Sequence, residues 1–460
     1  MSTRCSEEQF LFEAFAGRKV VGAFDGGAVT SIGGALLLRE ADRAIGLTTL
    51  VANCFADRRL QEAVIHTKQT LLAQRVHGIA LGYEDISDHD DLRHDPVLAL
   101  LSDTDTPKRK DVATLAGKST LQRLETAPAT GKSRYHKFEV DEDALADVFP
   151  KLYIGAHKRP PKRIILDLDA TDDPLHGHQE GRFFHGYYRC YCYLPLYIFA
   201  GRHLLVAKLR RANQDAAAGT CEEVQRIVTL IRAAWPDVEI WLRADSGFAR
   251  DDLMTWCEEN RVAYIFGLAK NTRLVAMIKN ELANAEAGFL YTRQATRVFK
   301  DLRYRTRKSW SCERRVVAKA EHLAKGANPR FIVTSLTVED FERQELYEKH
   351  YCQRGEMENR IKECQLDMFA DRTSAATMRA NQLRLWFASL AYVLVDAVRR
   401  LALQGSDLAR ATCGTIRLKL LRIAAVVTTS VRRIKVAFAT ACPQRHVFAM
   451  AHQRLTTAAA

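Results

Sequence analysis

Two acidic side chains stand at the ends of apolar runs, where a folded sheet could place them side by side. Asp169 ends the β-branched run 163–169, and Asp245 ends a second apolar run, 238–245. Both runs have the composition of buried strands, and such strands rarely end in carboxylates without a cation nearby. In α/β folds, ligand chemistry is usually built at the carboxyl ends of the strands. The two aspartates are therefore candidates for one site.

A third acidic side chain, Glu358, lies in the charged run 351–362, which is rich in helix formers and contains no proline. Side chains three or four positions apart share a face of a helix, so Glu358 would lie between Arg354 and Lys362. Tyr351 lies one turn before Arg354 on the same face. A solvated helix with ordinary ion pairs has the same pattern. The acidic strand ends upstream favour a functional role for this face.

Three carboxylates at one sheet edge would repel one another strongly unless a divalent cation lay between them. Asp169, Asp245 and Glu358 offer only oxygen ligands, a set that favours Mg²⁺ or Mn²⁺ over zinc. Two such ions can activate an attacking water or hydroxyl and stabilise the leaving oxygen of a phosphodiester. The three residues therefore predict metal-dependent phosphodiester chemistry.

Other metal ligands are open alternatives. Asp167 shares a strand face with Asp169 and is a rival for the first ligand position. His176 and His178, followed by Glu180, contain ligand types that zinc accepts. A glycine separates the two histidines and no matched cysteine pair accompanies them, so a loop after the first strand is the favoured interpretation.

Strand-like and helical patterns alternate around these residues, which predicts an α/β core. A basic segment, 272–330, separates the second acidic run from the third, and its strand-like parts predict a β-rich insertion. Alternation over residues 303–307 would put three arginines on one strand face, which suits contact with phosphates. A merely solvated surface is the alternative. The three are Arg303, Arg305 and Arg307.

The N-terminal part, to about residue 125, has a mainly helical pattern. Within it, residues 111–125 have the pattern of a helix, a tight turn at Gly117 and a second helix. One interpretation is a helix-turn-helix that would direct Lys118, Gln122 and Arg123 towards nucleic acid. A packed helical hairpin without a DNA-binding role is the favoured interpretation.

The composition favours a polyanionic partner and a reducing compartment. The 460 residues hold 68 Lys and Arg against 55 Asp and Glu, a net charge of +13. The 11 cysteines form no Cys-x-x-Cys pair, which indicates reduced thiols in a cytosolic protein. The longest apolar run, 385–395, is too short to span a bilayer, and the first residues lack the pattern of a signal peptide.

The acidic motifs resemble those of the DDE transposases of bacterial insertion sequences. Residues 169–171 (Asp-Ala-Thr) resemble the first motif, residues 243–247 the second, and Tyr351, Arg354 and Glu358 with Lys362 the third. The amino-acid sequences of residues 168–177 and 351–363 are most similar to those of the family named for insertion sequence 1380. The resemblance covers most of the chain from about residue 20. One position departs from it, because Gln365 stands where the branch often has a lysine.

The resemblance implies an RNase H-like catalytic core that is interrupted by the basic insertion. It implies a transposase that binds the terminal inverted repeats of double-stranded DNA, cuts them and joins them to target DNA with two Mg²⁺ ions, for which Mn²⁺ can substitute. A homodimer on the DNA ends, a bacterial cytoplasmic and nucleoid location and stacking of Trp310 on an extruded base are also implied. On the third motif, Tyr351, Arg354 and Lys362 would contact the DNA, with the two cations meeting the phosphates of the transposon end. The alternatives are a structure-specific nuclease on the same core and a catalytically silent DNA-binding protein.

The expected domains follow from these motifs. They are a mainly helical N-terminal domain that is a candidate for DNA-end binding (1–130), the first part of the core (131–271), the insertion (272–330), the second part of the core with the Tyr-Arg-Glu helix (331–400), and a basic C-terminal region (401–460).

Overall fold

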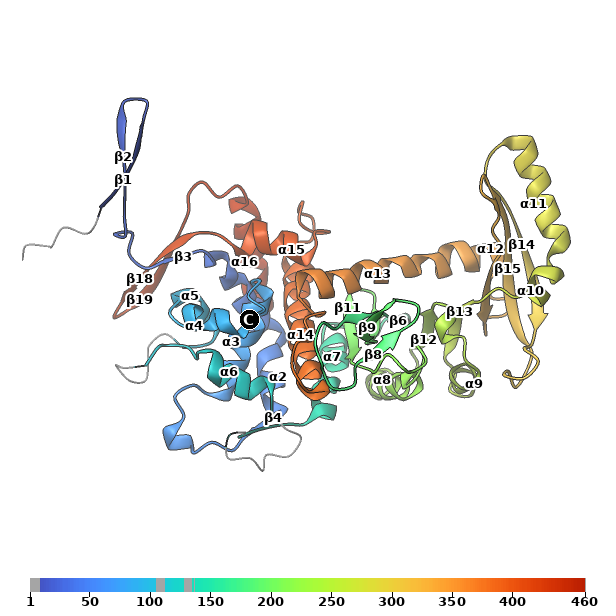
Figure 1. The fold of residues 1–460 in the computed structure, drawn as a ribbon, viewed down its shortest axis with the longest axis horizontal. Helices are drawn as coiled ribbons and strands as arrows, with labels where there is room; N and C mark the ends of the chain where they lie inside the picture. Colours follow the sequence, from blue (N-terminus) through green and yellow to red (C-terminus); the bar gives the residue numbers. More distant parts are fainter. Residues whose placement is uncertain (1–8, 105–111, 128–134, 136, 460) are drawn as a thin grey trace, which may run out of the picture. The chain divides into compact units, whose positions relative to one another are not determined.

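The computed structural model describes residues 9–104, 112–127, 135 and 137–459 (Figure 1). The chain divides into two compact units. Unit 1 comprises Met1–Val140 and Leu390–Ala460, and unit 2 comprises Asp141–Ser389. The first and last parts of the chain therefore belong to the same unit. The domain boundary expected at residues 130 and 131 lies outside the described residues.

A nine-stranded mixed sheet forms the centre of unit 2. Eight strands follow the order β11-β10-β6-β12-β13-β17-β15-β14, and β16 (Gly326–Ala327) pairs with β15. The pairs β6–β12 and β12–β13 are parallel, and the other pairs are antiparallel. The strands are β6 (Arg163–Ala170), β10 (Leu196–Ala200), β11 (His203–Lys208), β12 (Glu239–Ala244), β13 (Ala263–Leu268), β14 (Thr296–Tyr304), β15 (Arg314–Leu323) and β17 (Arg330–Thr334). The α/β prediction is thus confirmed at the level of a large mixed sheet with helices.

The two faces of this sheet pack against different helices, because side chains alternate along each strand. One face, with Leu168, forms an apolar core with α7 (Glu142–Gly155), α8 (Thr220–Ala234) and α9 (Asp251–Glu259). The opposite face, with Trp241, packs on Leu346. Asp167 and Asp169 alternate with the leucines of β6 and therefore lie on that second face.

Leu346 belongs to a helical run that crosses the second face and contains the charged stretch 351–362. The run consists of α12 (Arg343–Glu345), η5 (Leu346–Tyr351), η6 (Cys352–Arg354), α13 (Gly355–Lys362) and η7 (Glu363–Asp367). Its winding widens to a π-helix over η5 and η7 and tightens to a 3₁₀ turn over η6. Such irregular turns inside helices are frequent at functional sites.

The basic segment 272–330 differs from the β-rich prediction in its first third. Two helices, α10 (Thr272–Met277) and α11 (Lys279–Thr292), precede the predicted strands. The strands β14 and β15 then extend the central sheet as its last two members. Because β14 ends at Tyr304, Arg305 and Arg307 lie beyond it, and the expected row of three arginines on one strand face is not formed.

Unit 1 is mainly helical, with short strands at its edges. From the first part of the chain come α1 (Leu36–Ile45), α2 (Leu47–Asn53), α3 (Lys68–Ala80), α5 (Pro96–Leu101) and α6 (Lys118–Glu125). From the last part come α16 (Arg445–Ala459) and the pair β18 (Ala425–Ser430) and β19 (Arg433–Phe438). β18 pairs with β3 (Val29–Thr30), so strands from both ends of the sequence share one sheet. The residues of α14 (Met378–Ala402) are divided between the two units.

The helix-turn-helix prediction is wrong for its first helix. Residues 112–117 have no helix, and Asp111 lies outside the described residues. The side-chain amide of Gln74, on α3, forms hydrogen bonds with both backbone groups of Ala116. The Gln74 nitrogen donates to the Ala116 carbonyl oxygen at 2.8 Å, and the Gln74 oxygen accepts from the Ala116 backbone nitrogen at 3.0 Å. Those groups are therefore satisfied by a tertiary contact instead of a helical turn. The second helix is present as α6.

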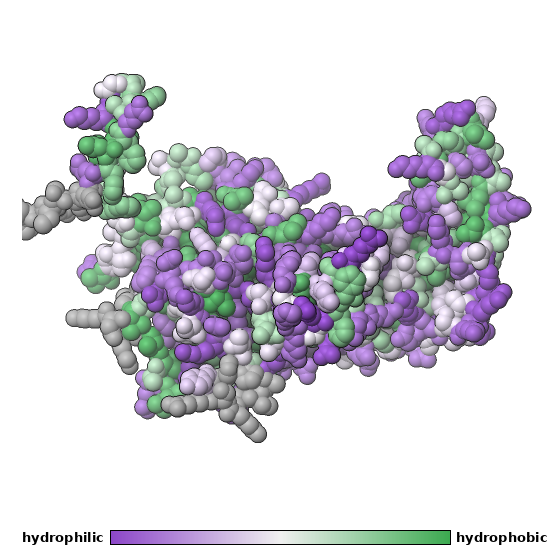
Figure 2. All heavy atoms as spheres, in the orientation of Figure 1, coloured by the Kyte–Doolittle hydropathy of each residue, from purple (hydrophilic) through white to green (hydrophobic). Residues whose placement is uncertain are grey.

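An exposed hairpin of β1 (Gln9–Phe15) and β2 (Arg18–Ala23) carries apolar side chains, which Figure 2 shows in green. They include Phe10, Phe12 and Val20.

Among the helices of the described residues, none combines the length and apolar character that crossing a bilayer requires.

Candidate active site

Asp169, Asp245 and Glu358 line one cavity of about 320 Å³ in unit 2. In the parallel pairing of β12 with β6, Ala244 lies opposite Leu168, so the aspartates that follow them reach neighbouring positions. Glu358 reaches the same cavity from α13. The structure therefore brings together the three carboxylates that stand 76 and 113 positions apart in the sequence (245 − 169 = 76; 358 − 245 = 113).

A guanidinium lies between two of these carboxylates. Arg354 Nη1 is 3.2 Å from Asp169 Oδ2, and Arg354 Nη2 is 3.0 Å from Glu358 Oε1. Arg354 comes from η6, one turn before Glu358, and is itself mostly buried. It supplies at this point the positive charge that crowded carboxylates require.

The cavity raises the cost of ionising Asp169. Burial raises the pKa of Asp169 to about 6, and the charges of Asp245 and Glu358 act in the same direction, while Arg354 lowers it. The Asp245 side chain accepts a hydrogen bond of 2.8 Å from the backbone nitrogen of Gly247, which orients it at the start of η4 (Ser246–Phe248). A further cation beside Asp169 would favour its charged form.

The donor set fits a hard divalent cation in its chemistry, because it consists of carboxylate oxygens. In the part of the chain that the structure describes, no three His, Cys, Asp or Glu side chains are spaced to hold a metal ion as they stand. This applies to His176 and His178 as well as to the cavity. Arg354 contacts both Asp169 and Glu358, so its side chain has to move before the two carboxylates can face one ion together.

Asp167, the rival for the first ligand position, is already paired. Its two oxygens accept hydrogen bonds from Arg243 Nε (2.5 Å) and Nη2 (2.8 Å). Arg243 stands opposite Asp167 on β12, and its Nη1 donates to the carbonyl oxygen of His350 at 2.5 Å. Both side chains are almost fully buried. Asp167 therefore joins two strands and the helical run, and only Asp169 reaches the cavity.

Tyr351 packs on a glycine beside the second aspartate. A Cβ atom on Gly267 of β13 would lie 2.6 Å from the Tyr351 hydroxyl and 2.9 Å from the backbone nitrogen of Ser246. Gly267 is therefore required for the close approach of Tyr351 and the chain at Asp245. Burial raises the pKa of Tyr351, and Arg354 opposes that rise. The sequence analysis did not single out Gly267.

Three aromatic residues that the sequence analysis also passed over line the same cavity. They are His185, Tyr187 and Tyr188, which lie in and next to the turn between β8 (Phe183–His185) and β9 (Cys190–Tyr193). The signal was present as an aromatic-rich stretch, but such residues are also typical of strands. Periodicity alone therefore indicated a strand and not a functional turn.

The other side chains that were predicted to contact DNA lie at several places in unit 2. Lys362 is exposed, as are Arg303, Arg305 and Arg307. Arg305 Nε donates a hydrogen bond of 3.1 Å to the carbonyl oxygen of Trp310. Trp310 is 4% exposed and packs edge-on against Tyr304, so its ring offers no open face for a base in this conformation.

Gln365 interacts with a buried carboxyl group. Its side-chain nitrogen donates to Asp173 Oδ1 at 3.0 Å and to the carbonyl oxygen of Asp172 at 3.1 Å. Burial raises the pKa of Asp173 to about 8, although the hydrogen bond from Gln365 lowers it. Asp173 Oδ2 is buried and has no hydrogen-bond partner among the described residues. The position where the resembling branch often has a lysine therefore serves an uncharged interior contact here.

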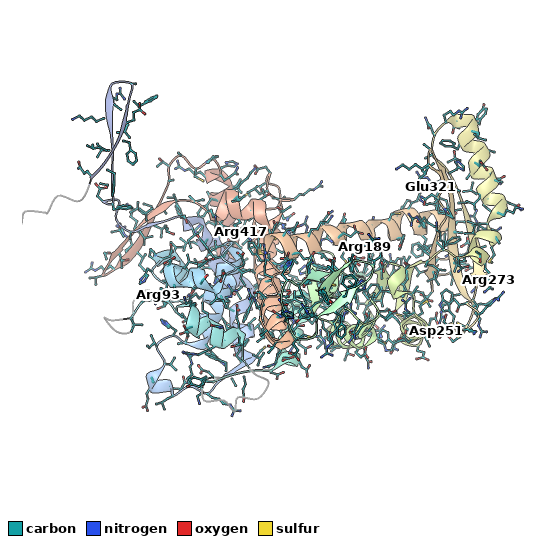
Figure 3. All side chains as sticks on the ribbon, in the orientation of Figure 1. Arg93, Arg189, Asp251, Arg273, Glu321 and Arg417 are labelled. Carbon is teal, nitrogen blue, oxygen red and sulfur yellow. The ribbon has the colours of Figure 1, made fainter. Side chains whose placement is uncertain are left out.

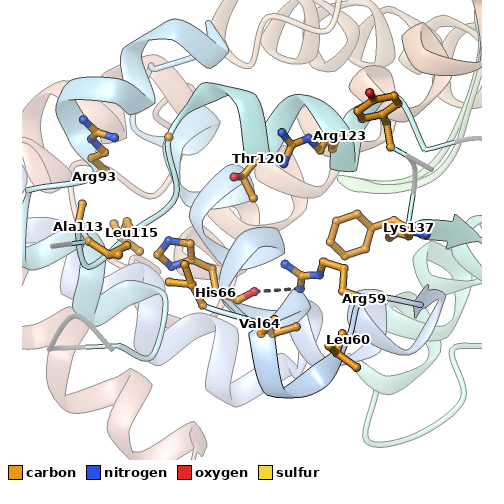
Figure 4. Close-up of a pocket in the computed structure, with 16 residues that line it drawn as sticks. Arg59, Leu60, Val64, His66, Arg93, Ala113, Leu115, Thr120, Arg123 and Lys137 are labelled. Carbon is orange, nitrogen blue, oxygen red and sulfur yellow. Dashed lines mark hydrogen bonds between the residues drawn. The ribbon is translucent and has the colours of Figure 1, made fainter. Parts of the chain in front are cut away.

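Unit 1 holds a second cavity, of about 670 Å³, which is shown in Figure 4. Its lining combines apolar side chains with the cations Arg59, Arg93, Arg123 and Lys137. The predicted DNA contact Arg123 thus lies on this cavity. The other, Lys118, is paired with Asp90, whose oxygens are 3.0 Å from the Lys118 backbone nitrogen and 3.1 Å from its Nζ.

Residues 12–460 match a family model described as transposase DDE domain group 1. None of the curated proteins matches the chain. Among solved structures, the chain is similar to one described as the cryo-EM structure of piggyBac transposase synaptic complex with hairpin DNA, with 11% identity over 84% of this chain and 80% of that chain and a TM-score of 0.38.

Proposed function

The chain belongs to the transposases of DDE domain group 1, and from that premise we propose that it binds terminal inverted repeats and catalyses metal-dependent strand cleavage and strand transfer in insertion-sequence transposition. We place it in the branch named for insertion sequence 1380. The observation that carries the proposal is the convergence of Asp169, Asp245 and Glu358 on one cavity. These are the proposed catalytic residues.

We propose that the same three carboxylates hold divalent ions, with two Mg²⁺ as the expected number and kind. When bound, such ions activate the attacking water or 3′ hydroxyl and stabilise the leaving oxygen of the phosphodiester. The raised pKa of Asp169 supports this role, because an additional positive charge at the cavity would relieve the cost of its ionisation.

The chain's own residues would then position the DNA. Arg354 and Lys362 flank Glu358 on the helical run, and their charges suit the phosphates of the transposon end. Tyr351, on the same helical run, packs against Gly267 and would hold Arg354 and Glu358 in place. We further propose that the five neighbouring strands β11, β10, β6, β12 and β13 form an RNase H-like core. In the segment 272–330, Arg303, Arg305 and Arg307 would contact phosphates. Unit 1 would contribute to DNA-end binding through its basic cavity.

A strand-transfer assay tests the proposal. The substrate is a duplex that ends in the repeat DNA flanking the gene, with a plasmid target and Mg²⁺. Joined product is the expected result. Hydrolysis without joining would support a structure-specific nuclease instead. Repeat binding with neither cutting nor joining would support a catalytically silent DNA-binding protein.

The metal is tested in the same assay. We expect activity with Mg²⁺ or Mn²⁺ and no loss with a zinc-selective chelator, because carboxylate oxygens favour the harder ions. Loss of activity that only zinc reverses would instead support a site at His176 and His178.

A further inference from the structure

We propose that the aromatic turn, defined as residues 185–189 from the end of β8 to the start of β9, binds an unpaired nucleobase of the DNA next to the carboxylate cavity. The proposal rests on the proposed function, because it supplies the nucleotide that adjoins the reacting phosphodiester. It assigns a binding site for unpaired nucleotides to residues that have no role in the proposed metal site.

The turn places one exposed and two half-buried aromatic rings at the cavity. Tyr187 is 83% exposed and lines the cavity together with Tyr188 and His185. The carboxylates Asp169 and Asp245 line the same cavity. A nucleotide whose phosphate lay at these carboxylates would therefore have its base within reach of the rings.

The rings are held in a fixed arrangement by one another. The Tyr188 ring centroid is 5.0 Å from that of Tyr187 at 86° and 4.9 Å from that of His185 at 44°. The Arg189 backbone nitrogen donates to the His185 carbonyl oxygen at 2.8 Å, which closes the turn. A large exposed ring that is braced from behind is a suitable stacking surface, because little side-chain freedom is lost on binding.

The chemistry of the surrounding hairpin matches nucleic acid. Phe184 and Tyr191 are opposite each other on β8 and β9, are both exposed, and their ring centroids are 5.6 Å apart. The Arg182 guanidinium lies 4.6 Å from the Tyr191 ring centroid. Rings combined with guanidinium groups are the pattern by which proteins bind single-stranded nucleic acid, since every base has a π-face.

Arg189 adds a charge at a costly position. It is exposed, it is labelled in Figure 3, and its φ is +57°, a left-handed conformation that favours glycine. An arginine in such a turn suits contact with a phosphate of the bound strand.

Only an unpaired base can use these rings, because the bases of a duplex are stacked inside it. Trp310 offers no competing surface in this conformation, since its ring is buried. Of the aromatic side chains that line the carboxylate cavity, Tyr187 is strongly exposed while Phe248 is buried. The turn is thus the aromatic surface at this cavity that a base can reach.

The test compares two duplexes of the terminal repeat, one blunt and one with a short unpaired 3′ overhang that carries 2-aminopurine, without divalent metal. The wild-type protein is expected to quench the 2-aminopurine fluorescence and to bind the overhang duplex about tenfold more tightly than the blunt one, as one stacked base provides. Tyr187→Ala should lose this preference, and Tyr187→Phe should retain it. Tyr291→Ala, at a residue of α11 that is 92% exposed, is the matched control and should behave as wild type.

Arg189→Gly provides a second readout. It should raise the melting temperature, because glycine adopts the left-handed conformation without strain, and it should weaken overhang binding. Failure of the inference is distinguishable from failure of the proposed function. If the wild-type protein joins DNA in Mg²⁺ but does not prefer the overhang, or if Tyr187→Ala keeps that preference, the inference is overturned alone. If the wild-type protein neither binds nor joins repeat DNA, the proposed function fails as well.

Discussion

Two aspartates of β6 stand two positions apart on the same face of the sheet and have opposite surroundings. Asp167 is enclosed by Arg243, which comes from the neighbouring strand in register and holds it with two hydrogen bonds. Asp169 faces a cavity, where it shares Arg354 with Glu358. One strand thus holds two aspartates that are each paired with a guanidinium, one in the interior and one at a cavity.

The difference lies in how each guanidinium is held. Arg243 Nη1 is tied to the carbonyl oxygen of His350, so all of its contacts belong to the interior. Arg354 donates hydrogen bonds to Asp169 and Glu358, which both line the cavity, and Glu358 is half exposed. We therefore expect the first pair to be structural and the second to open when a ligand binds in the cavity.

The largest effect is expected on the cavity side of this comparison. Asp245→Asn should abolish cleavage, because one of the three carboxylates proposed to bind metal is lost, and should leave repeat binding nearly intact, because DNA affinity comes mostly from Lys and Arg. Cleavage of a labelled repeat duplex and its binding in the same buffer measure both quantities. Wild-type turnover by this variant would refute the assignment of the site.

The buried pair should respond in stability. Arg243→Met leaves Asp167 buried without its cation, which should lower the free energy of unfolding by about 3–5 kcal/mol. The double variant Asp167→Leu, Arg243→Met should recover much of that loss, because no unpaired charge is left. Arg354→Met is the matched variant at the cavity, and its loss should be smaller. Chemical denaturation measures all three, and equal losses at Arg243 and Arg354 would remove the distinction between the pairs.

The acidic strand ends could be predicted from the sequence because their signal is local. An apolar run that ends in a carboxylate is visible within a few residues, as at Asp169 and Asp245. The choice between Asp167 and Asp169 could not be made in this way. It depends on the register of β12 against β6, which sets Arg243 opposite Asp167.

One error also has its origin in a long-range contact, and the two others have local causes. Residues 112–117 are not helical because Gln74, 42 positions from Ala116, takes the backbone groups of that residue. The helices α10 and α11 were missed because the strand-like alternation later in segment 272–330 was extended to its first third. Tyr187 was missed because a tyrosine is equally compatible with a hairpin turn, where its ring is exposed, and with a strand, where its ring is buried.

A third aspartate of unit 2 sharpens the comparison, because Asp173 is buried with an amide partner and without an ion pair among the described residues. Its pKa is about 8 in the folded protein and 3.8 in the unfolded chain, so its contribution to stability is complete below pH 3.8 and is lost as the pH rises through 8. Asp173→Asn cannot titrate. Its stability relative to wild type should therefore rise by up to about 1.4 kcal/mol per pH unit between these values. Denaturation at several pH values measures this, and a difference that does not change with pH would show that Asp173 is not held neutral.

The smallest expected effect concerns the two cations that flank Glu358. Lys362 is exposed and has no ion pair among the described residues, whereas Arg354 is engaged by Asp169 and Glu358. Lys362→Ala should therefore flatten the salt dependence of repeat binding by up to about one unit of slope, with or without Mg²⁺. Arg354→Ala should do so only when Mg²⁺ is present, because the guanidinium is free to meet a phosphate once the carboxylates have another cation. Glu358→Gln should leave the slope in the absence of metal close to that of wild type. Binding of an already cut repeat end across a salt series measures these slopes without turnover. If Arg354→Ala flattens the slope equally without Mg²⁺, its guanidinium is not held by the carboxylates, and the contrast with Arg243 fails at this point.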